Sequence, residues 1–336
     1  MIAATWPRSN RARARLLLVD RRSGALADRV ASELPEVLAP GDLLVVNDAA
    51  TLPGSLSGEA EGAPLELRLL DEHAGLWRAV AFGPGSWRTA TERRPPPPPL
   101  GTGSRLSFRG LSATVEAVLP PSPRLISLRF DQSAEEFWSA LYRVGKPVQY
   151  SYLSGDLRLW HVQNTYAARP WAAEAPSAGF VLSAELLGRL RQRGVEIATL
   201  THAAGLSSSG DAALDAALPL GERFEIPEAS VVAIARARAR AGRVIAVGTS
   251  VVRALETRAL ERGELLPGAG RSELRIGPGF SLRVVDGLLS GIHDPAASHY
   301  ALLQAFASPA HLAAAHAAAE RWGYLEHEFG DVCLLL

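Results

Sequence analysis

The pattern of apolar and polar positions divides the chain into two kinds of segment. Short apolar runs bounded by turn residues, at 16–20, 42–47 and 332–336, predict buried strands near both ends of the chain. Between residues 58 and 130 the pattern changes to alternating apolar and polar residues, separated by Gly, Pro or Ser. Such short strands at regular spacing predict a small antiparallel barrel or sandwich. The alternating segments are 65–70, 76–82, 104–110, 113–119 and 124–130.

Helical periodicity begins after these segments. Ser133 and Glu136 have the spacing of a capping box at the start of a helix. The remaining pattern predicts helices over 183–194, 227–241, 251–262, 297–306 and 309–322, and strands over 195–201, 243–247 and 282–288. Alternating strands and helices indicate parallel strands joined by crossover helices. We therefore predict an α/β domain formed by residues 1–57 and 146–336, carrying residues 58–145 as an inserted small antiparallel β-barrel.

Composition narrows the class of protein. The 336 residues include 35 basic and 35 acidic side chains, so the net charge of zero argues against wholesale electrostatic capture of nucleic acid but permits a local basic patch. The single cysteine, Cys333, can form neither an internal disulfide nor a cysteine-based zinc site. No apolar run is long enough to span a membrane. We expect a cytoplasmic monomer without a membrane partner.

Common nucleotide and metal motifs are missing from the sequence. It has no G-x-x-x-x-G-K-[ST] motif, no G-x-G-x-x-G after a strand and no H-E-x-x-H. ATP-driven chemistry, the common dinucleotide fingerprint and a catalytic metal therefore have no support, and we predict no metal site.

The best local signal is the strand-to-helix turn at 246–256. Gly248, Thr249 and Ser250 begin a helix after a strand, and Arg253 follows one turn later. The free N–H groups of a helix start suit a carboxylate or a phosphate. The alternative is a simple helix cap, because Thr and Ser are preferred there.

Two histidines and one acid are candidates for proton transfer. His202 follows a strand and precedes small residues and hydroxyls, so it lines a pocket or is a surface histidine on a loop. Asp286, inside an apolar run, and His293, just beyond it, form either a pair with shifted pKa values or a turn carboxylate and a core histidine.

Aromatic residues gather between 150 and 171. Arg158 and Arg169 are interleaved among them. Aromatic rings with arginine suit stacking on nucleic-acid bases, whereas packing of a long connecting segment explains them without a ligand. The aromatic and imidazole residues are Tyr150, Tyr152, Trp160, His161, Tyr166 and Trp171.

Several stretches, in order over nearly the whole chain, together resemble one family, the S-adenosylmethionine:tRNA ribosyltransferase-isomerases of queuosine biosynthesis. The family signatures P-G-D-L-L-V-x-N-D, A-V-G-T-T-x-x-R-x-L-E and N-F-H-x-P-x-S correspond to stretches within 40–58, 242–256 and 278–298. The stretches 15–24, 193–202 and 329–336 also match. The resemblance implies an α/β domain with a β-barrel insert, in agreement with the pattern above.

The resemblance also implies the chemistry. S-adenosylmethionine is the co-substrate and donates its ribosyl group to the aminomethyl group of a 7-deazaguanine base in tRNA. Epoxyqueuosine forms, and adenine and methionine leave. The expected catalytic residues are His202, His293 and Asp286. The expected substrate-binding residues are Gly248, Thr249, Ser250, Arg253, Ser177, Gly179, Asn47 and Asp331.

The sequence departs from the family pattern around the expected pocket. Val181 replaces a histidine of the family, and Glu222 is the remnant of an H-x-H-x-E element. The family's segment before Ile2 is short or missing. These changes leave two alternatives open: a paralogue that uses S-adenosylmethionine on a small molecule or another nucleoside, and a non-catalytic RNA- or nucleoside-binding relative.

Overall fold

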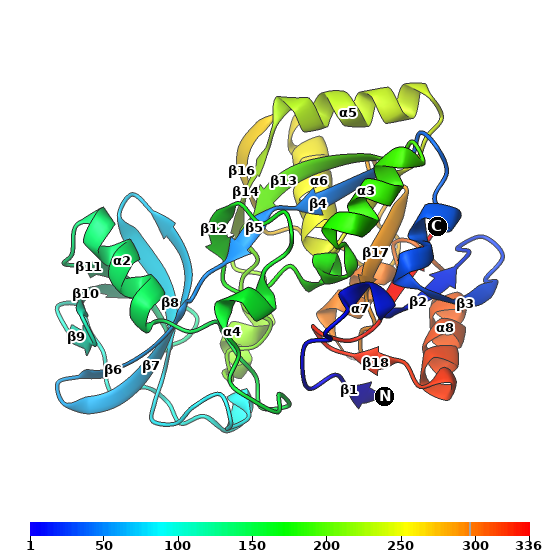
Figure 1. Ribbon diagram of the computed structural model, residues 1–336. Helices are drawn as coiled ribbons and strands as arrows, with labels where there is room; N and C mark the ends of the chain where they lie inside the picture. The colour runs from blue at the N-terminus through cyan, green and yellow to red at the C-terminus, as the bar shows by residue number, and fades with distance from the viewer. Residues whose placement is uncertain (296) are drawn as a thin grey trace.

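Apolar runs from both ends of the chain come together in one mixed sheet (Figure 1). The structure, a computed structural model, describes residues 1–295 and 297–336. Parallel strands form the centre of the sheet, as predicted: β13 (Glu196–His202), β4 (Leu43–Asn47), β15 (Val244–Val247) and β17 (Gly287–Gly291). Antiparallel β14 (Glu222–Ile226) and β16 (Gly268–Ser272) extend one side. On the other side follow β19 (Val332–Leu335), β2 (Arg15–Val19) and β3 (Leu26–Val30).

Helices cover both faces of this sheet. Side chains of a strand point alternately to opposite faces, so Leu43 and Val45 join one core whereas Leu44 and Val46 join the other. Helices cover both faces of a parallel sheet, which is why residues 43–46 of β4 are all apolar. The first core contains α5 (Glu228–Ala239), α6 (Thr249–Arg262), α7 (Ser298–Leu303) and α8 (Pro309–Trp322). The second contains α1 (Leu34–Val37) and α3 (Ala184–Gln192).

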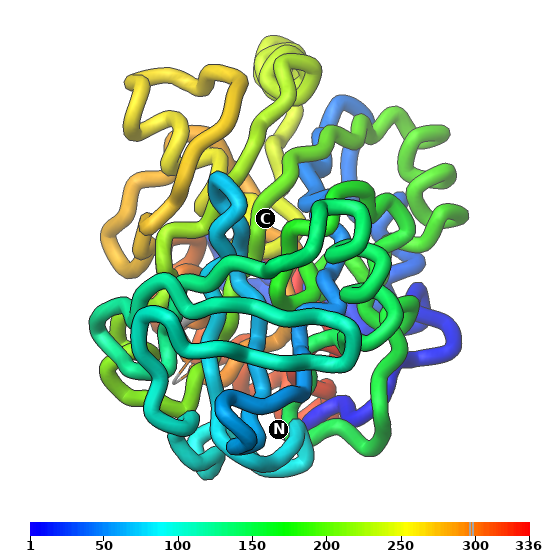
Figure 2. Tube along the Cα trace, turned by 90° about the vertical axis from the view of Figure 1, so that its left-hand side faces the viewer, coloured from blue at the N-terminus to red at the C-terminus, as the bar shows by residue number. Residues whose placement is uncertain are grey.

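The alternating segments form a closed antiparallel barrel, to the left of the α/β part in Figure 1 and in front of it in Figure 2. Its strands are β6 (Ser55–Ala60), β7 (Ala63–His73), β8 (Leu76–Phe82), β9 (Arg105–Phe108), β10 (Leu111–Val118) and β11 (Leu125–Phe130). The helix α2 (Ala134–Val144) begins with the predicted capping box and packs Phe137 and Leu141 into the barrel core. The predicted fold class is confirmed. The boundaries 58–145 stay a prediction, and β6 begins before them, at Ser55.

The predicted strand over 282–288 is wrong in its position, because β17 covers Gly287–Gly291. The apolar residues Val284 and Val285 are buried without a strand partner. Their N–H groups, and that of Arg283, donate instead to the carboxylate of Glu256 on α6, at 2.8–3.0 Å. The sequence pattern predicts that Val284 and Val285 are buried, but it does not predict that the Glu256 carboxylate accepts their N–H groups.

A long connecting segment joins the barrel to α3 and lies between the two parts. It contains the 3-10 helices η4 (Leu159–Val162) and η5 (Ser177–Val181) and the strand β12 (Arg169–Ala172), which pairs with β5 (Ala49–Thr51). A small apolar cluster of Ala4, Leu153, Leu157, Val162, Phe180 and Phe329 fixes this segment to the N-terminal residues. Two short strands, β1 (Ile2–Ala3) and β18 (Leu325–Glu326), pair with each other outside the large sheet. The short helix α4 (Ala212–Ala217) follows β13 in the chain.

Candidate active site

The carboxyl ends of the parallel strands bring three of the predicted residues together. Open α/β sheets bind ligands at this edge. The Asn47 side chain, at the end of β4, donates to the His202 carbonyl and accepts from the His202 N–H, both at 2.9 Å. The same amide also donates to Ser250 Oγ at 3.4 Å. Asn47 therefore joins the ends of two strands to the start of α6.

The N-terminus of α6 opens onto the same edge. Gly248 precedes the helix with φ of +93°, a conformation that favours glycine, and provides no capping side chain. The first-turn N–H groups of Thr249 and Ser250 are thus uncapped by a side chain. A helix start of this kind attracts an anionic group. The predicted role of Gly248, Thr249 and Ser250 in holding an anion is compatible with this geometry.

Arg253, one turn into α6, is already paired with a carboxylate. Its guanidinium donates to Glu222 at the start of β14. The other Glu222 oxygen accepts from the Gly205 N–H at 2.6 Å. Burial raises the pKa of Glu222, and the charge of Arg253 opposes this increase. Glu222 was noted in the sequence only as a remnant of a family element, and the geometry makes it a central residue of the site.

His202 lies beside this ion pair and is fully buried. Its Nε2 atom is 3.4 Å from Glu222 Oε2. Burial, assisted by the charge of Arg253, lowers the pKa of His202 well below its usual value, so the imidazole is neutral. Neither ring nitrogen has a hydrogen-bond partner among the described residues. A buried imidazole whose nitrogens make no hydrogen bond needs an explanation, and a catalytic role or a bound ligand supplies one.

A pair of histidines, His293 and His299, lies near Arg253. Ser290 Oγ and His293 Nε2 are 2.7 Å apart, and the His293 ring stacks on His299 of α7 at 5.2 Å. Burial lowers the pKa of His293 to about 3. Burial and the charge of Arg253 lower that of His299 to about 4. His299 had no sequence signal, because only the fold places α7 against this edge.

The 3-10 helix η5 brings further unpartnered polar atoms close to the start of α6. A Cβ atom on Gly179 would lie 1.9 Å from Tyr166 Oη and 2.9 Å from Asn164 Oδ1, so only glycine fits there. Both of these oxygens are buried without a partner in the described structure. Next to Gly179, Ala178 packs against Gly248, which places η5 beside the start of α6. The unpartnered oxygens of Asn164 and Tyr166 thus both lie beside Gly179.

Asp331 is fully occupied in holding the N-terminal segment. Its carboxylate accepts from the backbone N–H groups of Arg15 and Leu325, each at 2.8 Å, and from the Arg8 guanidinium at 2.6 Å. It lines a cavity of about 20 Å³ that Ser177 also lines. Glu328 lines the same cavity, and burial raises the pKa of its carboxyl to about 7. Asp331 and Ser177 therefore share a small cavity with Ala178 and Val181 of η5.

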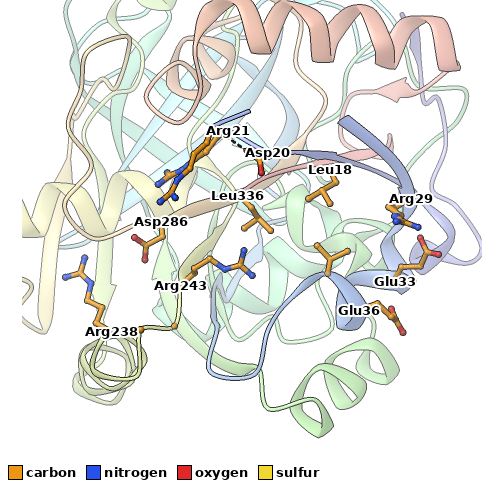
Figure 3. A pocket seen from close by; sticks show the side chains of 14 residues that line it. Leu18, Asp20, Arg21, Arg29, Glu33, Glu36, Arg238, Arg243, Asp286 and Leu336 are labelled. Atoms are coloured by element: carbon orange, nitrogen blue, oxygen red, sulfur yellow. Dashed lines mark hydrogen bonds between the residues drawn. The ribbon is translucent and has the colours of Figure 1, made fainter. Parts of the chain in front are cut away.

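Asp286 lies at the opposite edge of the sheet. It precedes β17, and its carboxylate accepts from the Val244 N–H at 2.9 Å. It lines a hollow of about 950 Å³ together with Arg243 and Leu336 (Figure 3). His293 follows β17 at its other end, so the structure does not bring Asp286 together with His293 or with His202.

The described residues hold no group of three His, Cys, Asp or Glu side chains placed to bind a metal ion. The site is built instead from a carboxylate, imidazoles, a guanidinium and helix N–H groups. No helix in the described part of the chain is long and apolar enough to cross a membrane.

Comparisons with known proteins show the family of this chain. A family model described as queuosine biosynthesis protein matches residues 1–335. The S-adenosylmethionine:tRNA ribosyltransferase-isomerase of Gloeobacter violaceus is 38% identical, over 99% of this chain and 92% of that protein. The protein of the same name from Anaeromyxobacter dehalogenans strain 2CP-C is 37% identical, over 100% and 96%.

A solved structure has the same fold. The S-adenosylmethionine tRNA ribosyltransferase of Thermotoga maritima superposes with a TM-score of 0.56 at 24% identity, covering 100% of this chain and 96% of that one. The match over the full length, in sequence and in fold, leaves one conclusion: this chain belongs to the family of queuosine biosynthesis proteins.

Proposed function

We propose that this chain is an S-adenosylmethionine:tRNA ribosyltransferase-isomerase. It transfers and isomerises the ribosyl group of S-adenosylmethionine onto 7-aminomethyl-7-deazaguanine in tRNA, which gives epoxyqueuosine and releases adenine and methionine. Relatives that carry this enzyme name match the chain over nearly its full length. The structural observation that carries the proposal is the buried group of His202, Glu222 and Arg253 beside the start of α6.

The first chemical requirement is a base. The sulfonium of S-adenosylmethionine acidifies the neighbouring C5′–H, so a shielded side chain can remove this proton. His202 and Glu222 supply two acceptor groups in contact, one a neutral imidazole and the other a carboxylate. We assign proton removal to this pair. Arg253 stabilises the charged form of Glu222 against the effect of burial, and this carboxylate in turn stabilises the imidazolium that forms.

The second requirement is to hold the substrate. The uncapped N–H groups at the start of α6 suit the carboxylate of the methionine part. The unpartnered Asn164 and Tyr166 oxygens lie beside Gly179 and suit polar groups of the substrate. We assign His293, which is neutral and hydrogen-bonded to Ser290, to substrate orientation.

The test is chromatography of S-adenosylmethionine after incubation with the protein and tRNA carrying 7-aminomethyl-7-deazaguanine. We expect adenine and methionine in equal amounts, and none with the same tRNA carrying guanine at that position. Donor cleavage at the same rate without tRNA would favour a small-molecule acceptor. No cleavage with either tRNA would overturn the proposal. Because the substrate is tRNA, we place the reaction in the cytoplasm; a monomeric state stays a prediction.

A further inference from the structure

Three rings of the N-terminal and connecting segments form an exposed aromatic surface, which we call the aromatic platform. Trp160 on η4 is 70% exposed and Trp6 is 41% exposed. The His161 ring lies between them, with centroids 5.1 Å from Trp6 and 5.6 Å from Trp160. A largely exposed tryptophan adds little to the core, and exposed apolar clusters mark interaction sites.

The platform is held rigidly in place. Arg11 donates to the His161 and Gln163 carbonyls at 2.6 and 2.8 Å, which fixes the end of η4. The His161 ring nitrogen Nδ1 accepts from the Arg158 N–H at 3.0 Å, which fixes its start. Below it, Leu157 and Val162 belong to the small apolar cluster. The indole of Trp160 is therefore presented to solvent by a well-supported backbone.

The platform is directly connected to the candidate active site. Trp160 and Asn164 are four positions apart, so their Cα atoms lie within about 14 Å of each other. Asn164 contacts Gly179 at the site. Arg11 lies 4.6 Å from the centroid of the Phe180 ring, which belongs to η5 next to Gly179. A nucleotide bound at the site therefore has neighbours in the tRNA loop that lie within reach of Trp160.

Charge favours RNA as the occupant. Arg158, whose backbone N–H donates to the His161 ring, is exposed, and Arg11, which donates to the His161 carbonyl, is partly exposed. Unpaired bases in RNA loops are recognised by stacking on aromatic rings, with arginine at the backbone phosphates. We propose that an unpaired base of the tRNA loop, next to the nucleotide that reacts, stacks on Trp160. This inference rests on the proposed function, since it takes tRNA to be the substrate.

The test compares Trp160→Ala and Trp160→Phe with Tyr142→Ala, a matched loss of an exposed ring (48% exposed) on the barrel helix α2. We expect Trp160→Ala to weaken binding of an anticodon stem-loop about 10- to 100-fold. Trp160→Phe should recover most of the affinity, and Tyr142→Ala should bind like the wild type. Adenine release should show the same loss in kcat/KM at low tRNA concentration and little change at saturating tRNA.

Binding measurements separate this inference from the proposed function. Stem-loop affinity is measured by fluorescence anisotropy without S-adenosylmethionine, so it is informative even if no adenine is ever released. Equal affinity of Trp160→Ala and wild type would overturn the platform while leaving the enzyme activity intact. A change in oligomeric state by size-exclusion chromatography, with unchanged RNA affinity, would make the platform a protein interface and would also overturn the inference.

Discussion

The imidazole of His202 and the carboxylate of Glu222 lie 3.4 Å apart, and burial shifts their pKa values in opposite directions. Each shift favours the neutral form of its group. Arg253 opposes the shift of Glu222 and adds to that of His202. The arrangement therefore places a neutral imidazole beside a carboxyl group whose charged form is opposed by burial and stabilised by the guanidinium of Arg253.

Removing the Glu222 charge should abolish most of the activity. In Glu222→Gln we expect kcat to fall about 100-fold or more, because the base loses its charged partner. Adenine release at saturating substrates measures this. The control is Glu225→Gln, on the same strand, where the carboxylate is 36% exposed and pairs with Arg169. Equal kcat values for both variants would remove Glu222 from the mechanism.

Removing Arg253 should make stability depend on pH in a defined direction. Without the guanidinium, the pKa of Glu222 rises further, so the folded state binds a proton that the unfolded state releases above about pH 4.5. The stability of Arg253→Gln should therefore fall as the pH rises from 5 to 8, to a deficit of about 3 kcal/mol against wild type. Urea unfolding at both pH values tests this. Arg236→Gln, which removes an arginine that is 47% exposed, is the control.

Glu328 should destabilise the protein in alkaline solution. Burial raises the pKa of its carboxyl to about 7, and Oε2 has no partner among the described residues. The protonated carboxyl fits its buried position, so no stability is lost below about pH 4.5, where the unfolded state is protonated as well. Stability then falls as the pH rises through 7, because the folded state must release this proton. We expect Glu328→Gln to match wild type at pH 5 and to exceed it by about 1–2 kcal/mol at pH 8. An identical pH dependence of unfolding in both proteins would contradict this.

Glu256 should be a structural residue. Its buried carboxylate accepts the N–H groups of residues 283–285, and its removal leaves these donors unsatisfied. We expect Glu256→Ala to lose about 3–5 kcal/mol of unfolding free energy. Glu261→Gln, on the same helix with a side chain 45% exposed, should change stability by less than about 0.5 kcal/mol. Urea titrations of both variants decide the matter.

Gly179 should tolerate no side chain. The Cβ of Gly179→Ala would collide with Tyr166 Oη, so we expect a loss of about 1–3 kcal/mol and of most activity. Gly188→Ala, within α3 where the new Cβ meets nothing within 4 Å, should instead stabilise the protein by about 0.5–1 kcal/mol. Thermal unfolding of the two variants measures the difference. A stable, active Gly179→Ala would show that η5 moves freely.

Local patterns predicted most of the fold. The capping box at Ser133 and Glu136 and the apolar run of β4 each depend on neighbours in sequence, and both were confirmed. The strand predicted over 282–288 is wrong in its position because the N–H groups of residues 283–285 donate to Glu256, about 28 positions earlier, and not to a neighbouring strand. Such a partner has no signature in the run itself.

The site was predicted less completely, for the same reason. Asn47 and His202 end strands and Ser250 lies at the start of a helix, so their common edge could be inferred. Glu222 enters from an antiparallel strand at the side of the sheet, and His299 enters from α7. Their positions depend on the complete topology. Asp286 precedes its strand rather than following it, and only the true bounds of β17 reveal this.

The position of β19 between β17 and β2 has a consequence for biosynthesis. The hairpin of β2 and β3 is made early, but its neighbour in the sheet is made after every other strand of the sheet. The Arg15 N–H even donates to Asp331, 316 positions later. On the ribosome, the edge of β2 that pairs with β19 therefore stays without its partner until nearly the whole chain has emerged. We expect slow, late completion of folding, and nascent chains that lack β19 should be preferred substrates for chaperones and proteases.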